Sequence, residues 1–282
     1  MPSQTVHKIM SRTIQLSFVT VATGRYIDFW KAQVLSAIEY LNKDFPIEFV
    51  LLTDQVAAAE SFKEELSKTS NWTIKIGFVE HQSWPFPTLY KFKHILTHAD
   101  LLGGENIWHL DADMLFNNRD VAKELDEYCS SNKMIFVSHP GYFRKSGFSK
   151  FKFYLFNPDY LIRDLKNYIL EGGIGSWEKN ERSLAYVPRD KRNKYVCGGS
   201  WGGNRDKFIE FSNVISQRID KDYSSGLIAR FHDESHINWY AANNVCEIIS
   251  TSYCFEESYK NLRDLPGKII AVNKSAVATW ER

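Results

Sequence analysis

The 282-residue chain lacks the features that mark several functional classes. Its 35 basic and 34 acidic residues leave a net charge of +1. That balance argues against a nucleic-acid binder that neutralises phosphates, although a local basic patch remains open. The four cysteines form no C-x-x-C pair and have no zinc-site spacing; they are Cys129, Cys197, Cys246 and Cys254. Such sparse thiols predict a reduced, cytoplasmic-type protein with buried cysteines.

Long apolar runs are missing as well. No stretch approaches 18 uninterrupted apolar residues, so the sequence predicts no membrane span. The first 20 residues contain no apolar signal-peptide core and lead directly into a strand-like segment. We therefore expect a protein of the cytoplasm. What the chain does have is 44% hydrophobic and 15% aromatic residues, enough to bury a large core in one two-lobed domain.

Strand-like apolar runs alternate with helical patterns through the first half, which predicts an α/β fold with crossover helices. The predicted strands cover residues 14–22, 47–53, 73–79, 107–110 and 134–138, and the predicted helices cover 26–41, 56–68, 89–102 and 120–129.

The second half is less regular. Asn157 and Pro158 open a predicted helix that Gly172 and Gly173 close. A charged loop follows up to residue 194, and we expect this loop, with few apolar anchors, and the tail after Gly267 to be mobile without substrate. The remaining predicted elements are a Gly-rich strand, a helix over 205–219, a helix that begins near HDESH and leads into 237–243, and a strand near 247–250. One face of the 157–172 helix is apolar; it carries Leu161, Ile162, Leu165, Tyr168 and Ile169.

An apolar run ends in the acidic triplet of Asp111, Ala112 and Asp113. On a strand, alternate side chains point the same way, so the two carboxylates can meet one hard cation. Mg²⁺ or Mn²⁺ held by one or two carboxylates and substrate phosphates fits this pattern. Ligands of open α/β sheets bind beyond the carboxyl ends of strands. The triplet therefore indicates a nucleotide diphosphate site, with an ordinary solvated loop as the alternative.

Two further motifs carry chemistry. HDESH, residues 232–236, departs from the zinc-protease pattern because its glutamate is third rather than second. Asp233 and Glu234 stand at a predicted helix start, where one carboxylate can cap amides while the other enters a cleft, or both can cap. The glycine pairs at 198–199 and 202–203 lack the context of a dinucleotide or P-loop motif. They indicate a strand bulge or a close approach to a ligand.

Together these segments resemble one family. VATGRYIDFW, HLDADM, SHPGYF, SLAYVP with CGGSWGG, and FHDESHINWY occur in the order and spacing of glycosyltransferase family 6, the retaining α-1,3-galactosyl and N-acetylgalactosaminyl transferases that include the ABO blood-group enzymes. The resemblance covers about residues 14–260. It implies a GT-A fold, a Rossmann-like mixed sheet flanked by helices in a single two-lobed domain. The implied parts are a nucleotide-binding half over 13–113, an acceptor and catalytic half over 114–260, and a tail over 261–282 that closes over the donor.

The resemblance also implies how a UDP-sugar is held. Asp111 and Asp113 would bind Mn²⁺, or another divalent cation, against the diphosphate. Tyr26 matches a tyrosine that stacks near uracil, and Lys91 matches a basic residue at the donor sugar and phosphates. Lys274 in the tail is the candidate for a closing contact to the diphosphate.

Roles in catalysis and acceptor binding follow in the same way. Glu234 matches the catalytic carboxylate below the anomeric carbon, and Asp233 matches a residue that binds a donor-sugar hydroxyl. His139, Phe231 and Glu256 match the acceptor side. The implied acceptor is a galactose-terminated glycan, with or without fucose. Retention can use Glu234 as a nucleophile or as support for front-side attack.

The donor sugar is partly readable from glycines. Gly141 and Gly199, with Gly198 beside them, match donor-binding positions at which small residues accompany N-acetylgalactosamine in this family. An N-acetyl group needs the volume that a side chain would fill, so UDP-GalNAc is favoured over UDP-Gal. A glycan-binding protein without turnover is the alternative of another class, and the intact carboxylates argue against it.

Two departures concern the acceptor side. The stretch from Arg144 to Gly175 is longer than in vertebrate members, and Phe231 replaces a tryptophan usual before HDESH. Vertebrate members carry a Golgi membrane anchor, whereas this chain looks like a bacterial or viral relative. The acceptor's identity is therefore not transferred.

Overall fold

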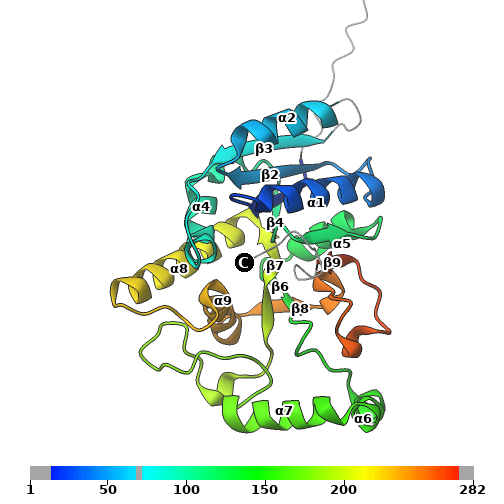
Figure 1. Ribbon diagram of the computed structural model, residues 1–282, viewed down its shortest axis with the longest axis vertical. Coiled ribbons are helices and arrows are strands. Elements are labelled where there is room, and N and C mark those ends of the chain that lie inside the picture. Colours follow the sequence, from blue (N-terminus) through cyan, green and yellow to red (C-terminus); the bar gives the residue numbers. More distant parts are fainter. Residues whose placement is uncertain (1–13, 68–71, 273–282) are drawn as a thin grey trace, which may run out of the picture.

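The computed structural model describes residues 14–67 and 72–272. A seven-stranded sheet runs through the centre in the order β3-β2-β1-β4-β7-β6-β8, and β5 and β9 form a small second sheet (Figure 1). The strands are β1 Leu16–Val21, β2 Ile47–Thr53, β3 Thr73–Phe78, β4 Asn106–Leu110, β5 Met114–Phe116, β6 Met134–Ser138, β7 Val196–Asn204, β8 Cys246–Ile249 and β9 Ile269–Ala271.

Most neighbouring strands are parallel. β1 to β4 form a parallel block, and β6 is parallel to β8. β7 is antiparallel to both β4 and β6, and so joins the two blocks. The α/β class and the mixed sheet predicted from the sequence are therefore confirmed. One sheet runs through both of the halves expected from the sequence, whose division of labour stays a prediction.

Helices cover both faces of this sheet (Figure 1). Phe18 and Phe49 point into one apolar core under α1, α2 and α5, whereas Val19 and Val50 point into the other, under α4, α8 and α9. This alternation follows from the two-residue repeat of a strand. The helices are α1 Tyr26–Tyr40, α2 Val56–Leu66, α3 Phe86–Leu89, α4 Lys91–Thr97, α5 Val121–Cys129, α6 Gly147–Phe156, α7 Pro158–Glu171, α8 Arg205–Ser224 and α9 His232–Asn243.

The helix predicted over 89–102 is divided in the structure. It starts three residues earlier, at Phe86, where Pro87 lies in the first turn, and it is interrupted at Tyr90 and again at His98 before a 3-10 turn, Ala99–Leu101. Prolines suit a first helical turn because they lack the amide hydrogen that is unpaired there anyway. The sequence also gave no sign of α6 or of the β5–β9 pair.

The Gly-rich strand contains a bulge. Phe136 of β6 faces Trp201 of β7, but two residues later Ser138 faces Val196, so β7 has extra residues between these points. Gly198 and Gly199 lie in that irregular stretch. Gly202 is required for another reason, because a Cβ at this position would overlap the indole of Trp108. The bulge predicted from the glycines is confirmed.

The loop after α7 is better anchored than expected. Trp177 and Val187 are each only 1% exposed, and the buried guanidinium of Arg192 donates hydrogen bonds to the carbonyls of Val187, Glu171 and Glu178. The expectation of few apolar anchors is wrong, since aromatic and aliphatic residues spaced along the loop pack inward.

The described part of the tail is also held in place. β9 pairs with β5, and the amide of Val272 donates to the carbonyl of Asp113 at 2.9 Å. Lys274, the candidate for a closing contact, lies outside the described residues. Within residues 14–67 and 72–272, no helix is long and apolar enough to cross a membrane.

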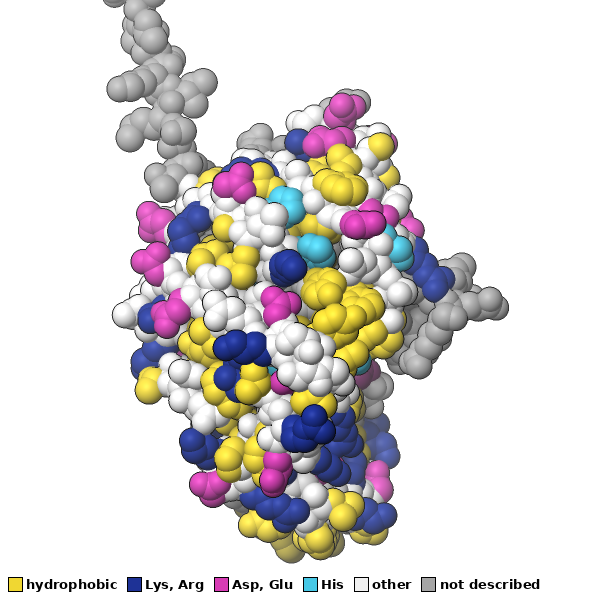
Figure 2. Space-filling view, turned by 90° about the vertical axis from the view of Figure 1, so that its left-hand side faces the viewer, with side chains coloured by type: hydrophobic (Ala, Val, Ile, Leu, Met, Phe, Trp, Pro, Cys, Tyr) yellow, Lys and Arg dark blue, Asp and Glu magenta, His cyan; other side chains and the backbone are white. Residues whose placement is uncertain are grey.

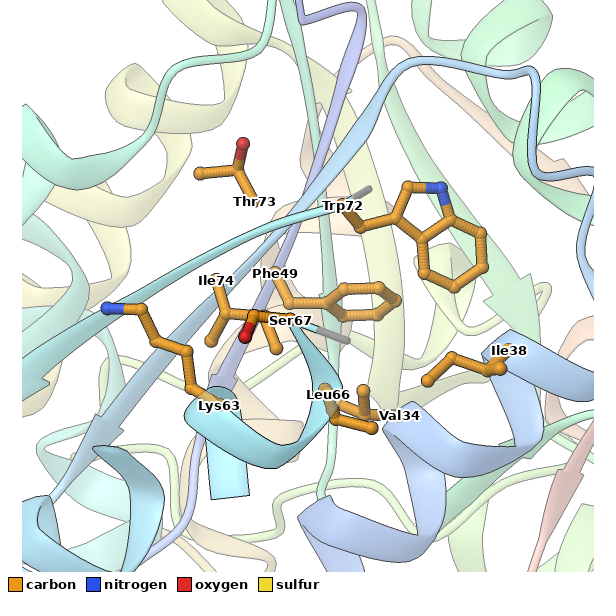
Figure 3. A pocket seen from close by; sticks show the side chains of 9 residues that line it. All are labelled: Val34, Ile38, Phe49, Lys63, Leu66, Ser67, Trp72, Thr73 and Ile74. Atoms are coloured by element: carbon orange, nitrogen blue, oxygen red, sulfur yellow. The ribbon is translucent and has the colours of Figure 1, made fainter. Parts of the chain in front are cut away.

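A cavity of about 250 Å³ lies between α1, α2 and the β2–β3 edge of the sheet (Figure 3). Its walls include Phe49, Trp72 and Ile74, and Lys63 is the charged side chain among its lining residues. Thr73 and Ile74 stand at the amino end of β3, opposite to the end where α/β proteins bind ligands. This cavity is a packing gap rather than a candidate catalytic site.

Candidate active site

The candidate site lies where β4 ends and the bulge of β7 meets the start of α9. Asp111 and Asp113 follow the end of β4 at Leu110, as predicted, but the triplet forms a turn before β5, so the strand alternation invoked for the two carboxylates does not apply. The amide of Met114 closes that turn on the carbonyl of Asp111, and Gln33 of α1 donates to the carbonyls of both Asp111 and Met114 at 2.9 and 3.0 Å. The placement of the two carboxylates therefore comes from a clamped turn and not from strand alternation.

Lys91 links this turn to the start of α9. Its ammonium lies 2.9 Å from Asp111 Oδ1 and 2.9 Å from Asp233 Oδ2, and the residue is only 4% exposed. Burial alone would lower the pKa of Lys91, but the two carboxylates raise it above its ordinary value. Lys91 is therefore a charged buried group, and it joins carboxylates that are far apart in the sequence.

The side chain of Asp111 is 40% exposed. Its Oδ1 receives both Lys91 and, at 3.1 Å, His109 Nε2. Burial would raise the pKa of Asp111, but Lys91 and His109 hold it well below its ordinary value. Burial itself lowers the pKa of His109 to about 4. Asp111 is thus an ionised carboxylate at neutral pH, and its neighbour Asp113 is half-buried at the same turn.

Glu234 is fixed through both carboxylate oxygens. The hydroxyl of Tyr195 donates to Oε1 at 2.9 Å, and the amide of Gly198 donates to Oε2 at 2.9 Å. Burial raises the pKa of Glu234 to about 7, although these two hydrogen bonds oppose the rise. A Cβ at position 198 would lie 3.1 Å from Glu234 Cβ, so glycine lets strand and helix approach closely.

The first residue of α9 has an unusual backbone. His232 has φ 46° and is the one non-glycine residue with positive φ among the described residues. Left-handed conformations of non-glycine residues cost free energy and are concentrated at functional sites. Here the conformation precedes Asp233 and Glu234, and the ring of His232 lies edge-on to exposed Trp84 at 4.8 Å. Phe231, immediately before it, is 38% exposed.

His139, one of the three residues predicted for the acceptor side, lies next to Tyr195. The ring of His139 packs 5.6 Å from that of Tyr195, and its amide donates to the carbonyl of Tyr195 at 3.0 Å. Burial lowers the pKa of His139 to about 4, and the charge of Glu256 opposes that fall. A Cβ at Gly141 would lie 3.3 Å from the His139 ring and 3.4 Å from Tyr259. His139 and Glu234 are thus connected through one tyrosine.

Tyr26 begins α1 directly after the loop that follows β1, and it is 37% exposed. The loop is held by Asp54, which accepts from the amide of Gly24 at 2.6 Å, and by His81, whose Nδ1 lies 3.0 Å from the hydroxyl of Thr23. Gly24 has φ 56°, which favours glycine. Tyr26 precedes Gln33 by two helical turns, on the same side of α1.

Several residues of the site gave no signal in the sequence. Tyr195, immediately before β7, holds Glu234, whereas Gln33 of α1 and His109 of β4 hold Asp111. Tyr195 and Gln33 are distant in the chain from their partners, so no motif contains both members of either pair. His109 lies beside Asp111 in HLDADM, but the motif does not show that its ring contacts the carboxylate.

Comparisons with known proteins point to glycosyltransferases. The family model described as glycosyltransferase family 6 matches residues 168–279. The chain is 26% identical to the O-antigen biosynthesis glycosyltransferase WbnI of Escherichia coli, over 90% of this chain and 92% of that protein. It is 21% identical to globoside alpha-1,3-N-acetylgalactosaminyltransferase 1 of Gallus gallus, over 88% of this chain and 64% of that protein.

A shorter match, 30% identical over 29% of this chain and 24% of the relative, is to histo-blood group ABO system transferase 1 of Rattus norvegicus. The chain thus covers less than two thirds of the length of these two vertebrate relatives.

Proposed function

Because the chain belongs to glycosyltransferase family 6 and is a glycosyltransferase, we propose that it transfers N-acetylgalactosamine from UDP-GalNAc, with retention and in α-1,3 linkage, to a galactose-terminated glycan, with or without fucose. UDP-Gal is the alternative donor. The observation that supports this most is the carboxylate of Glu234, held by Tyr195 and Gly198 beside the ion-paired cluster of Lys91, Asp111 and Asp233.

The turn residues fit a divalent cation. Among the described residues no three metal-ligating side chains gather in one place. Two carboxylates therefore suit a hard cation completed by diphosphate oxygens better than an all-protein site. Asp111 has one oxygen engaged by Lys91 and His109, and its side chain remains partly exposed. Asp111 and Asp113 would hold Mn²⁺, which supplies charge stabilisation to the departing UDP.

The chain's own residues supply the rest. Lys91 would stabilise negative charge on the diphosphate. Asp233 pairs with Lys91 and would also accept a hydrogen bond from a sugar hydroxyl. Glu234 in its ionised form stabilises positive charge at the anomeric carbon, as a nucleophile or as electrostatic support. Its two hydrogen bonds fix the carboxylate before substrate arrives.

The function is tested by UDP release and product analysis. UDP-GalNAc and UDP-Gal are compared with and without galactosides, fucosylated or not, and with Mn²⁺ or EDTA, and the linkage of the product is determined by NMR. We expect transfer from UDP-GalNAc to exceed transfer from UDP-Gal, with an α-1,3 product. No transfer from either donor to any galactoside would refute the proposed substrates.

Glycines 141 and 199 make separate predictions about the donor. A methyl group at Gly141 would enter the space beside His139 and Tyr259, where we place the N-acetyl group. Gly141→Ala should lower the ratio of kcat/KM for UDP-GalNAc over UDP-Gal by roughly 10-fold or more, the scale of one methyl clash. Paired kinetics with both donors measure this ratio.

Gly199→Ala serves as the comparison, although from the sequence Gly199 was also expected to select the donor sugar. Its Cβ would lie 2.8 Å from Asp111 Oδ2 and 2.8 Å from Met114 Cε, so it should displace the carboxylate and lower kcat/KM for both donors, with little change in their ratio. If Gly199→Ala changes the ratio and Gly141→Ala does not, our placement of the N-acetyl group is wrong.

The pKa of Glu234 predicts the pH dependence of the reaction. Because only the ionised carboxylate acts, and burial raises its pKa to about 7, kcat/KM should rise as the pH increases through about 7 and then level off. Tyr195→Phe removes a hydrogen bond that favours the ionised form, so the midpoint should move to higher pH. An unchanged midpoint in that variant would show that another group controls the profile.

A further inference from the structure

The surface of α6 and α7 is unusually apolar. Of the nineteen large hydrophobic side chains that are exposed in the described part of the chain, ten lie on these two helices. They are Phe148, Phe151, Leu155, Phe156, Leu161, Ile162, Leu165, Tyr168, Ile169 and Leu170. Their exposed fractions run from 38% to 79%. A concentration of exposed apolar side chains on two adjoining helices indicates an interaction surface.

Helix α7 is oriented opposite to an ordinary surface helix. Its apolar stripe, predicted from the sequence, recurs at helical spacing, yet Ile162, Leu165 and Ile169 are 55%, 53% and 68% exposed. An amphipathic helix usually turns such a stripe towards the core. Here the polar side is turned inward, and Asp164 is only 5% exposed.

Buried ion pairing fixes that orientation. Asp164 accepts from Arg144 Nε at 2.6 Å, from Arg144 Nη2 at 2.7 Å and from the hydroxyl of Tyr154 at 2.7 Å. The guanidinium of Arg163 stacks on buried Tyr160 at 4.3 Å. Rotating α7 to bury its apolar stripe would expose these partners and separate them. The outward stripe is therefore a built feature of the fold.

The charges around the stripe are mainly positive. Helix α6 contains Lys150 and Lys152 and no acidic residue, and α7 exposes Lys166. Asp159 is the exposed acid of the two helices, since Asp164 and Glu171 are buried. Figure 2 shows hydrophobic and basic side chains together over the lower end of the molecule, where Figure 1 places these helices.

This composition favours one kind of partner. Lysine is depleted at protein–protein interfaces, and a symmetric contact between two copies would bring like charges together. Apolar helices with aromatic residues and flanking lysines are typical of the boundary of an anionic bilayer. With 10 and 14 residues, α6 and α7 are too short to cross a membrane.

We propose that α6 and α7 dock the protein on an anionic lipid surface. The docking helices are tied to the acceptor side, because Arg144 and Arg163 both donate to the carbonyl of Gly141, at 3.1 and 2.9 Å. A docked molecule therefore holds the His139 loop close to the bilayer. This inference rests on the proposed function and extends it to the acceptor: the glycan acceptor is carried by a lipid in that surface.

Vesicle binding tests the docking itself, independently of turnover. The full chain is sedimented with vesicles of phosphatidylcholine alone and with vesicles in which about a third of the lipid is anionic phosphatidylglycerol. We expect binding to the anionic vesicles to be at least about 10-fold tighter, and to weaken with salt. In the triple variant Ile162→Gln, Leu165→Gln, Ile169→Gln, the affinity for anionic vesicles should fall by about 10-fold or more. Its melting temperature and its activity on a water-soluble acceptor should be unchanged.

A matched variant controls for exposed apolar residues in general. Leu35→Gln, Phe78→Gln and Val245→Gln alter side chains that are 50%, 63% and 80% exposed elsewhere on the molecule, and they should leave vesicle binding unchanged. Equal loss in both triple variants, or no binding to anionic vesicles, overturns docking. Docking is also overturned if sedimentation equilibrium shows that the wild type is a dimer and the α7 triple variant is a monomer.

The docking proposal and the proposed activity can fail independently of each other. Vesicle binding without transfer to any galactoside leaves docking intact and refutes the proposed activity. Transfer to a soluble acceptor without vesicle binding supports the proposed activity and refutes docking. If both hold, a lipid-linked galactoside in anionic vesicles should be glycosylated at least about 10-fold faster by the wild type than by the α7 variant, while the soluble acceptor is used equally.

Discussion

Replacing Glu234 with glutamine should lower kcat by roughly 10² to 10³-fold and leave UDP binding almost unchanged. The amide keeps the shape of the carboxylate, and its oxygen can still accept from the amide of Gly198. What it removes is the negative charge beside the anomeric carbon, and loss of one electrostatic stabiliser has an effect of this size. Initial rates with a saturating donor and calorimetric titration with UDP make the two measurements.

Stability measurements show whether the variant is a fair test. Since burial raises the pKa of Glu234 to about 7 from the ordinary value of 4.5, the wild type loses stability as the pH rises through this range. The glutamine variant has no such component, so its melting temperature should fall less between pH 5 and 8. A folded variant with near-normal kcat would reduce Glu234 to a residue that closes α9 onto β7.

Asp113→Asn should remove most of the activity, by about 10²-fold or more, and weaken the apparent affinity for Mn²⁺. One carboxylate fewer leaves diphosphate charge poorly compensated in a partly buried site. EDTA should have the same effect on the wild type. The measurement is a titration of turnover against Mn²⁺ in both proteins. An undiminished reaction rate in EDTA would show that Asp111 and Asp113 do not act by binding a cation.

Asp111→Asn is the informative comparison. Asp111 is a partner of buried Lys91, whose remaining carboxylate partner would be Asp233. Removing one member of a buried ion pair is strongly destabilising, so this variant should lower the melting temperature as well as the activity. Asp113→Asn should affect mainly the activity. Equal loss of stability in both variants would contradict the separate roles that we give these neighbours.

The strands and helices that pack the sheet could largely be predicted from the sequence, because burial on both faces requires continuous apolar runs. Phe18 and Val19 illustrate this, since neighbours on β1 enter opposite cores. The boundaries of the turn at Asp111 could not be predicted. Its backbone is fixed by Gln33, Gly199 and Val272, three contacts that depend on tertiary structure.

Candidate site residues could be named from the sequence, but their contacts with one another could not. Motif resemblance pointed to Lys91 as a donor contact, whereas the structure also shows it between Asp111 and Asp233. That link depends on the strand order, which places β4 beside β7. The outward face of α7 was unpredictable for a similar reason, since periodicity reveals a stripe but not which side of the helix finds Arg144.

The pairing of β5 with β9 has a consequence for how the molecule is made. Ribosomes add residues 269–271 long after residues 114–116, yet these segments form one ladder, and Val272 ties off the carbonyl of Asp113. While the chain is growing, the acidic turn has no partner on that side and must wait for it. Because a domain generally folds as a unit, the acidic turn can be completed only after the segment that forms β9 has been made. A chain truncated before Ile269 would therefore lack the ladder with β5 and the hydrogen bond to the carbonyl of Asp113 that hold the acidic turn on that side.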